Sequence, residues 1–209
     1  MVAAPILALI NPDLVPGPLL CTALLLTILI AIREHTGMDL SGLKYALLGR
    51  VPGTVVGAAA QALITQAVIG VGFGVVVLAG VAMSALGPRF EQSRTALLGA
   101  GFLSGVMGTA TSVGGPPMAL LYQHAEAHRI RGTLAGFFSI GVVMSLTGLA
   151  VVGRFGWSHV RLALLLMPGA ILGFVLSRRV ASLIDLRYAR LVLLTFTAVA
   201  GIAVIVRSF

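Results

Sequence analysis

Hydroxyl side chains interrupt one otherwise apolar stretch in the middle of the chain, at Ser104, Thr109, Thr111 and Ser112. The stretch continues into Gly114-Gly115-Pro116-Pro117. Proline lacks a backbone N–H and paired glycines favour non-helical backbone, so no continuous helix is expected across 109–117. A broken helix leaves free N–H groups and a partial positive charge at the start of its second part. With hydroxyl donors beside them, these groups suit an oxyanion.

The predicted anion site is drawn from this stretch and from one arginine: Ser104, Gly105, Gly108, Thr109, Thr111, Ser112, Gly114, Gly115, Pro116 and Arg50. The alternative for the glycines is packing, because small residues spaced by four let helices approach closely. Arg50 lies inside an apolar run. It could attract the anion, as an intramembrane arginine often does, or extend its head group to the membrane surface.

Composition identifies the elements that must carry this site as membrane helices. Hydrophobic residues make up 58% of the 209 positions and charged residues 10%, whereas a soluble domain carries about 25% charged residues. The net charge of +8 does not indicate nucleic-acid binding, because the basic residues lie in short gaps between apolar runs, as topology signals do. One cysteine excludes an internal disulfide, and no span contains an acidic residue. We therefore expect no cofactor, no metal site and no enzyme activity.

The apolar runs predict an all-α polytopic membrane protein. Six ordinary spans are expected, at Val15–Ile32, Leu43–Ile64, Ala67–Leu86, Gly132–Val152, Val160–Ser177 and Leu191–Val206. The interrupted element, Thr95–Tyr122, lies between the third and the fourth span. A polar loop is expected at His124–Arg131, before the fourth span.

Three short matches relate the two halves at offsets of 111 to 116 residues. One of them pairs Pro52-Gly53/Gly57 with Pro168-Gly169/Gly173. If the interrupted element enters and leaves the membrane on the same side, eleven Lys and Arg residues fall on that side of the membrane and three on the other. This favours two inverted repeats, 1–92 and 93–209, each a re-entrant hairpin plus three transmembrane helices. The first hairpin is N-terminally incomplete, so either the natural product is longer or the first repeat has degenerated.

With these motifs in place, the chain resembles the TauE/SafE family of membrane permeases. The resemblance rests on Gly101-Phe-Leu-Ser-Gly105-Val-Met-Gly108, on the Gly-Gly-Pro-Pro motif at 114–117, and on the paired Pro-Gly helices. It implies export or uptake of sulfite, sulfoacetate and related small organosulfur anions. The chain departs from the family pattern because the first glycine-rich copy is cut away and Thr109–Ser112 replace glycines of the second.

We therefore expect a secondary transporter for a small anionic substrate, acting by alternating access in the bacterial inner membrane, with export as the expected direction. The alternative is a non-transporting membrane subunit that scaffolds a larger complex. Apart from the lipid bilayer and the anion, the sequence leaves open a homodimer as partner.

Overall fold

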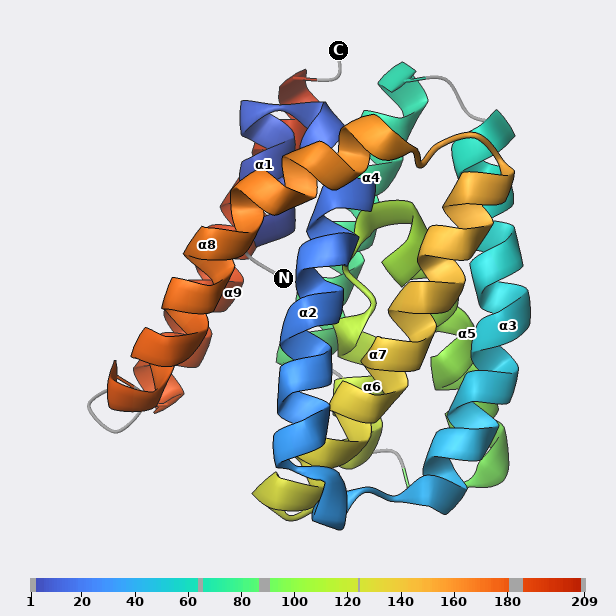
Figure 1. The fold of residues 1–209 in the computed structure, drawn as a ribbon, viewed down its shortest axis with the longest axis vertical. Helices are drawn as coiled ribbons and strands as arrows, with labels where there is room; N and C mark the ends of the chain where they lie inside the picture. The colour runs from blue at the N-terminus through green and yellow to red at the C-terminus, as the bar shows by residue number, and fades with distance from the viewer. Residues whose placement is uncertain (1–2, 64–65, 87–90, 124, 181–185, 208–209) are drawn as a thin grey trace.

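The computed structural model describes residues 3–63, 66–86, 91–123, 125–180 and 186–207, with side chains for 3–63, 71–85, 91–123, 125–176 and 194–206. The described residues are helical, with connecting turns and no strand. The α-helices are α1 (Ala3–Ile10), α2 (Gly17–Arg33), α3 (Leu40–Leu63), α4 (Gln66–Leu86), α5 (Arg94–Thr111), α6 (Gly115–Tyr122), α7 (Ala127–Val151), α8 (Trp157–Val180) and α9 (Leu186–Arg207) (Figure 1). Two 3₁₀ turns, Pro12–Leu14 and His35–Gly37, precede α2 and α3.

Three segments of the described chain are long and apolar enough to cross a membrane: Pro12–Arg33, Ala127–Val151 and Trp157–Leu176. Val71–Ala85 of α4 and Leu194–Val206 of α9 are shorter apolar helical stretches with described side chains. The chain is therefore an all-helical membrane protein, as expected. The full set of six spans stays a prediction, and the basic residues at 89 and 178–190 that entered the charge count lie outside the described side chains.

The expected break is present. Helix α5 ends at Thr111, and Ser112 adopts the left-handed conformation with φ 62°, where its N–H bonds the carbonyl of Gly108 at 2.9 Å. Helix α6 then begins at Gly115 and runs back along α5. At the open end, the Gln92 side-chain amide donates to the carbonyl of Leu121 at 3.0 Å. Helices α5 and α6 thus form an antiparallel pair, called the 94–122 hairpin below; its re-entry from one membrane face stays a prediction.

Element order and helix pairing recur in the two parts of the chain that flank α5. Helices α1 and α6 both have 8 residues, and α3 and α8 both have 24 and contain an internal proline. Helix α2 packs on α8 as α7 packs on α3, and α1 packs on α9 as α6 packs on α4. Helix α5 is the exception, because none of the described helices corresponds to it. The division into repeats at residue 92 and their inversion stay predictions.

Helices α3 and α5 run parallel in close contact. A Cβ on Gly53 would overlap the carbonyl of Phe102, and one on Gly57 would lie 2.8 Å from the carbonyl of Val106. A Cβ on Gly105 of α5 would lie 2.7 Å from the carbonyl of Arg50. Each helix presents glycines four residues apart to the other, so the two backbones touch. This is the GxxxG type of membrane helix contact.

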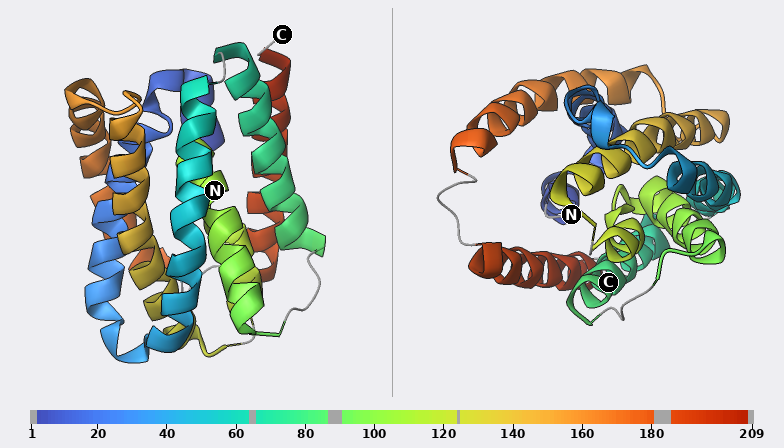
Figure 2. Two further views of the ribbon diagram at one scale, coloured as in Figure 1. Left: turned by 90° about the vertical axis from the view of Figure 1, so that its right-hand side faces the viewer. Right: turned by 90° about the horizontal axis from the view of Figure 1, so that it is seen from below.

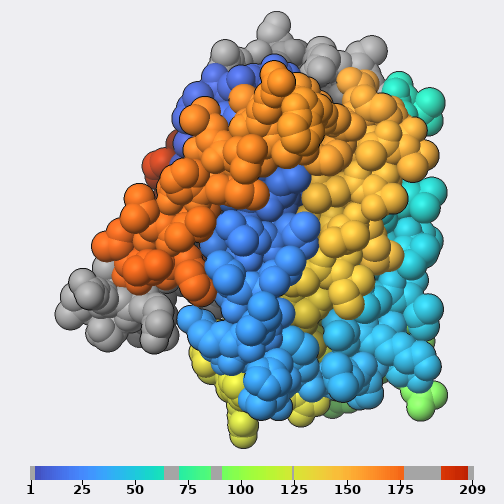
Figure 3. All heavy atoms as spheres, viewed as in Figure 1, coloured from blue at the N-terminus to red at the C-terminus, as the bar shows by residue number. Residues whose placement is uncertain are grey.

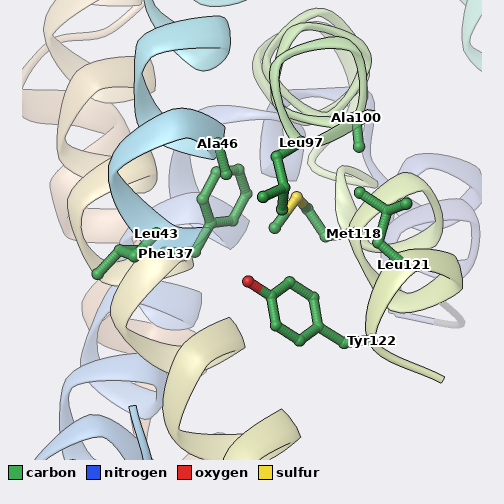
Figure 4. Packing of buried hydrophobic residues seen from close by; sticks show 8 residues of the cluster. All are labelled: Leu43, Ala46, Leu97, Ala100, Met118, Leu121, Tyr122 and Phe137. Carbon is green, nitrogen blue, oxygen red and sulfur yellow. The ribbon is translucent and has the colours of Figure 1, made fainter. Parts of the chain in front are cut away.

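An apolar cluster fills the space between α3, α5, α6 and α7 (Figure 4). Met118 and Tyr122 of α6 and Phe137 of α7 are completely buried in it. It also contains Leu43, Ala46, Leu97, Ala100 and Leu121. The cluster fixes the hairpin against α3 and α7, next to the polar groups described below.

Four helices begin at least three residues earlier than expected: α8 at Trp157 instead of Val160, α9 at Leu186 instead of Leu191, and α3 and α7, both of which start beside Asp39. Helix α3 begins at Leu40, not Leu43, because Asp39 accepts the N–H of Gly42 at its side chain and that of Leu43 at its carbonyl. Helix α7 begins at Ala127, so the expected loop at His124–Arg131 is wrong from residue 127 on. Arg129 pairs with Asp39 at 3.2 Å, which anchors the extra turn.

A second acidic residue, Glu34, ties the same turn to the end of α2. The side chains of His128, Arg131 and Arg33 all reach its carboxylate, at 2.5, 3.3 and 3.2 Å. The hydrogen bonds from His128 and Arg131 lower the pKa of Glu34 to about 2. Burial raises the pKa of Asp39, but hydrogen bonds from Gly42, Ser41 and Arg129 outweigh it and leave the pKa below its usual value.

Candidate anion site at the helix break

Arg50 lies at the centre of the candidate site. It projects from the middle of α3 toward the hairpin, and only 1% of the residue is exposed. Its Nη1 donates to the hydroxyl of Ser104 at 3.1 Å, and its Nη2 to the hydroxyl of Ser145 at 3.5 Å. A buried guanidinium cannot be a surface topology signal. The interpretation that Arg50 extends to the membrane surface is therefore wrong.

Helix α7 supplies the other walls around this guanidinium. The ring centroids of Phe137 and Phe138 lie 4.8 and 5.7 Å from the Arg50 Cζ, within the range of cation–π attraction. Gly141, one turn further, leaves the room that the side chain needs, because a Cβ at this position would overlap Nε and Cζ of Arg50. Apolar walls on two sides strengthen the field of the charge by excluding water.

Hydroxyl groups connect the arginine to the helix break. Ser104 donates to the carbonyl of Gly114 at 2.6 Å, inside the turn between α5 and α6. The hydroxyls of Thr109 and Ser145 lie 2.8 Å apart and share a hydrogen bond. Gly108 faces both the arginine and the break, because a Cβ on it would stand 3.3 Å from Nη2 of Arg50 and 3.5 Å from the Cα of Gly114. The structure thus gathers the arginine, both hydroxyls and the break around one point.

No acidic side chain compensates the charge of Arg50 in the described part of the chain. The ion pairs found there involve Glu34 and Asp39, both at helix ends. The Nε of Arg50 and the Oγ1 of Thr54, one turn further along α3, are buried without a hydrogen-bond partner. A buried cation held only by neutral hydroxyls and aromatic rings costs several kcal/mol unless an anion joins it.

The remaining predicted residues have other surroundings. Thr111 bonds the carbonyl of Met107 in its own helix at 2.7 Å, and Ser112 donates to the carbonyl of Pro16 at 3.0 Å. Gly105 packs on the backbone of α3, and Pro116 is buried in the first turn of α6. Gly115 faces open space, with nothing within 4 Å of a Cβ built on it. A role for these residues in binding stays a prediction.

Sequence reasoning missed four residues of α7: Phe137, Phe138, Gly141 and Ser145. Ser145 is a hydroxyl inside a predicted span, four residues after a glycine, and that spacing was a usable signal. The aromatic pair carried no such signal, since phenylalanines are common in membrane helices. Among the described residues, no three His, Cys, Asp or Glu side chains gather to hold a metal ion.

A buried arginine, held by hydroxyls beside a helix break in a chain with helices apolar enough to cross a bilayer, defines a membrane protein with a polar site in its interior. The family model described as Sulfite exporter TauE/SafE matches residues 1–204, so the chain belongs to this family. It is accordingly a membrane transporter of the sulfite-exporter type. No curated protein and no solved structure matched the chain significantly.

Proposed function

We propose that this chain is a secondary permease that exports a small organosulfur anion of the sulfite, sulfoacetate or sulfonate class, and that Arg50 binds the anion. The observation that carries the proposal is the uncompensated charge of Arg50, 1% exposed and without an acidic partner in the described structure. An oxyanion arriving at this point would replace the missing counter-charge. The site would then favour one negative charge and reject cations.

A transport cycle requires release of the anion as well as binding, and neutral hydrogen-bond donors suit release. Ser104, Thr109 and Ser145 are within hydrogen-bond distance of the arginine or of one another. Rotating hydroxyls can turn from their present acceptors toward sulfonate oxygens, and each such bond contributes about 0.5–1.5 kcal/mol net. A site with one fixed charge and several weak donors holds an anion without trapping it.

Export of an anion needs no further driving force in an energised cell. A membrane potential that is negative inside favours outward movement by about 2.3 kcal/mol per charge and 100 mV. In this proposal the chain is a multi-pass protein of the bacterial inner membrane, built from two inverted repeats with re-entrant hairpins. Alternating access would then come from movement of one repeat against the other around the fixed site.

Purified protein reconstituted into liposomes tests the proposal. Efflux of sulfite, sulfoacetate and taurine is measured for the wild type, Arg50→Gln and Arg94→Gln. Arg94 is the matched control because it also contacts an aromatic ring, that of Tyr45 at 5.3 Å, but lies exposed at the start of α5. Loss of a charged hydrogen-bond donor at the site corresponds to about 1.5–3 kcal/mol, or roughly 10- to 150-fold in flux.

We expect efflux of at least one of the three sulfur compounds from wild-type liposomes, a loss of that size in Arg50→Gln, and unchanged flux in Arg94→Gln. Equal flux in the wild type and Arg50→Gln would remove Arg50 from the site while leaving the transporter. Wild-type flux no higher than that of empty liposomes for all three compounds would reject this substrate class. Elution of each variant as a single peak in size-exclusion chromatography separates loss of binding from loss of folding.

A further inference from the structure

Thr54 of α3 has a hydroxyl that no other group of the described structure uses. Only 5% of the residue is exposed, and its Oγ1 has no hydrogen-bond partner. Thr22 of α2, by contrast, donates to the carbonyl of Pro18, four residues earlier in its own helix, at 3.0 Å. The corresponding carbonyl in α3 is that of Arg50, and Gly105 packs against it, because a Cβ on Gly105 would lie 2.7 Å away. A buried polar group without a partner is costly, so Thr54 is a candidate for a ligand contact.

Thr54 belongs to the same layer of helices as the buried arginine. It follows Arg50 by four residues, so both side chains lie on one face of α3. A Cβ on Gly105 of α5 would lie 2.9 Å from the backbone N of Thr54, and one on Gly148 of α7 would lie 3.4 Å from its Cγ2. Figure 2 shows α3 between α5 and α7, and Figure 3 shows α2, α7 and α3 covering this layer from one side. Thr54 is thus enclosed by the helices that hold the candidate anion site.

The two unpartnered atoms of α3, Nε of Arg50 and Oγ1 of Thr54, both require an acceptor. An arginine Nε–H can only donate, and a hydroxyl has one hydrogen to donate. Helix α7 offers no side-chain acceptor at these two points, since Gly141 packs on Nε and Gly148 packs beside Thr54. A ligand that satisfies both atoms must therefore bring at least two acceptor lone pairs. Next to a guanidinium without an acidic partner in the described structure, a negatively charged ligand is favoured.

We propose that the Thr54 hydroxyl donates a hydrogen bond to the anion that Arg50 binds, which makes Thr54 a further binding residue of the permease. The inference rests on the proposed function, because it concerns the same anion. It adds a requirement on the substrate, which must present one oxygen to the guanidinium and another to Thr54. Sulfite and sulfonates meet this requirement, because they carry three oxygens on one sulfur atom.

The unpartnered hydroxyl gives Thr54→Val two expected effects of opposite sign. Without the anion, valine has nearly the same shape and removes a buried polar group that lacks a partner, so the unfolding midpoint should equal or exceed that of the wild type. With the anion, a hydrogen bond is lost. The concentration that gives half-maximal efflux should then rise roughly 2- to 13-fold, the equivalent of about 0.5–1.5 kcal/mol for one neutral hydrogen bond. A residue that only packs α3 on its neighbours would instead lose stability without a change in this concentration.

Concentration-dependent efflux of sulfite and sulfoacetate from liposomes, together with unfolding midpoints in detergent without either anion, tests both effects. Thr22→Val is the matched control, because Thr22 is also 5% exposed but its hydroxyl already has a partner in Pro18. Thr54→Ser keeps the hydroxyl and should restore the half-maximal concentration of the wild type. We expect a raised half-maximal concentration in Thr54→Val alone.

Each other result bears on a different claim. Equal half-maximal concentrations in the wild type and Thr54→Val, or the same rise in Thr54→Ser or Thr22→Val, would overturn the role of Thr54 while leaving the permease and Arg50 in place. An unfolding midpoint of Thr54→Val below that of the wild type without the anion would overturn it as well, because the hydroxyl would then have a structural partner. Wild-type efflux no higher than that of empty liposomes would reject the proposed function, and this inference with it.

Discussion

The guanidinium of Arg50 fills the space that a side chain at position 141 would occupy, and Gly141 leaves that space free. The relationship joins α7 to α3 at the one point where the described side chains include a buried cation. It explains why a glycine lies in the middle of a 25-residue helix, where it lowers helix stability by about 1 kcal/mol relative to alanine. The glycine is therefore part of the site even though it offers no chemical group.

Gly141→Ala should displace the guanidinium and reduce transport. The added methyl overlaps Nε and Cζ, so the arginine must leave its hydroxyl partners or the helices must separate, at a cost of about 1–3 kcal/mol. Gly148→Ala on the same helix is the control, because its methyl would meet only side chains, at 3.3 and 3.4 Å. Efflux assays and thermal unfolding in detergent measure both effects. Similar losses in the two variants would contradict a specific role for position 141.

Ser145→Ala should weaken anion transport more than Ser139→Ala. Ser145 bonds both Arg50 and Thr109, whereas Ser139 bonds only the carbonyl of Ala135 in its own helix. The loss of a buried polar partner corresponds to about 1–3 kcal/mol, or roughly 5- to 150-fold in transport efficiency. Concentration-dependent efflux provides the measurement, and identical curves for the two variants would exclude Ser145 from the site.

Gly101→Ala and Gly99→Ala should have opposite effects on stability, although both change a glycine of α5. A Cβ at 101 overlaps the carbonyl of Ala46, whereas a Cβ at 99 meets nothing within 4 Å. We expect Gly101→Ala to destabilise by about 1–3 kcal/mol and Gly99→Ala to stabilise by about 0.5–1 kcal/mol through helix propensity. Unfolding midpoints in detergent measure the difference. Midpoints that shift in the same direction would mean that α5 does not touch α3 as described.

Glu34→Gln should destabilise the protein at neutral pH and have little effect near pH 2. The native-state pKa of Glu34, about 2, lies below its usual value of 4.5, because His128 and Arg131 hydrogen-bond the ionised form. The carboxylate therefore stabilises the fold fully above about pH 4.5, and this contribution fades as pH falls toward 2. Unfolding midpoints of the wild type and the variant should converge over this range. Glu126→Gln, a change on the exposed turn before α7, is the control and should leave the unfolding midpoint at neutral pH unchanged.

Local chemistry made the helix break predictable from the sequence, because prolines and paired glycines act on their own backbone. The break falls between Thr111 and Gly115, inside the expected 109–117. The burial of Arg50 could not be decided in the same way. It depends on Ser104, Phe137 and Ser145, which lie 54 to 95 residues further along the chain. Similarly, the early start of α7 follows from ion pairs with Glu34 at the end of α2 and Asp39 before the start of α3, which no local pattern contains.

The burial of Arg50 also sets an order of events during synthesis. Helix α3 is made before either helix that covers its arginine, and Ser145 follows Arg50 by 95 residues. At about 5–20 residues per second this delay lasts about 5–20 s. In the predicted six-span arrangement, an uncovered arginine near the bilayer centre disfavours insertion of α3 by about 2.5–3.5 kcal/mol throughout this delay.

A chain that ends at residue 126 should therefore leave Leu48→Cys of α3, in a Cys21→Ser background, open to a water-soluble thiol reagent. In the full chain, lipid should shield the same position, which is 54% exposed at the protein surface. Equal labelling of the two chains would contradict this order. Synthesis of α7, the last helix of the site, therefore determines when α3, the first, is stable in the membrane.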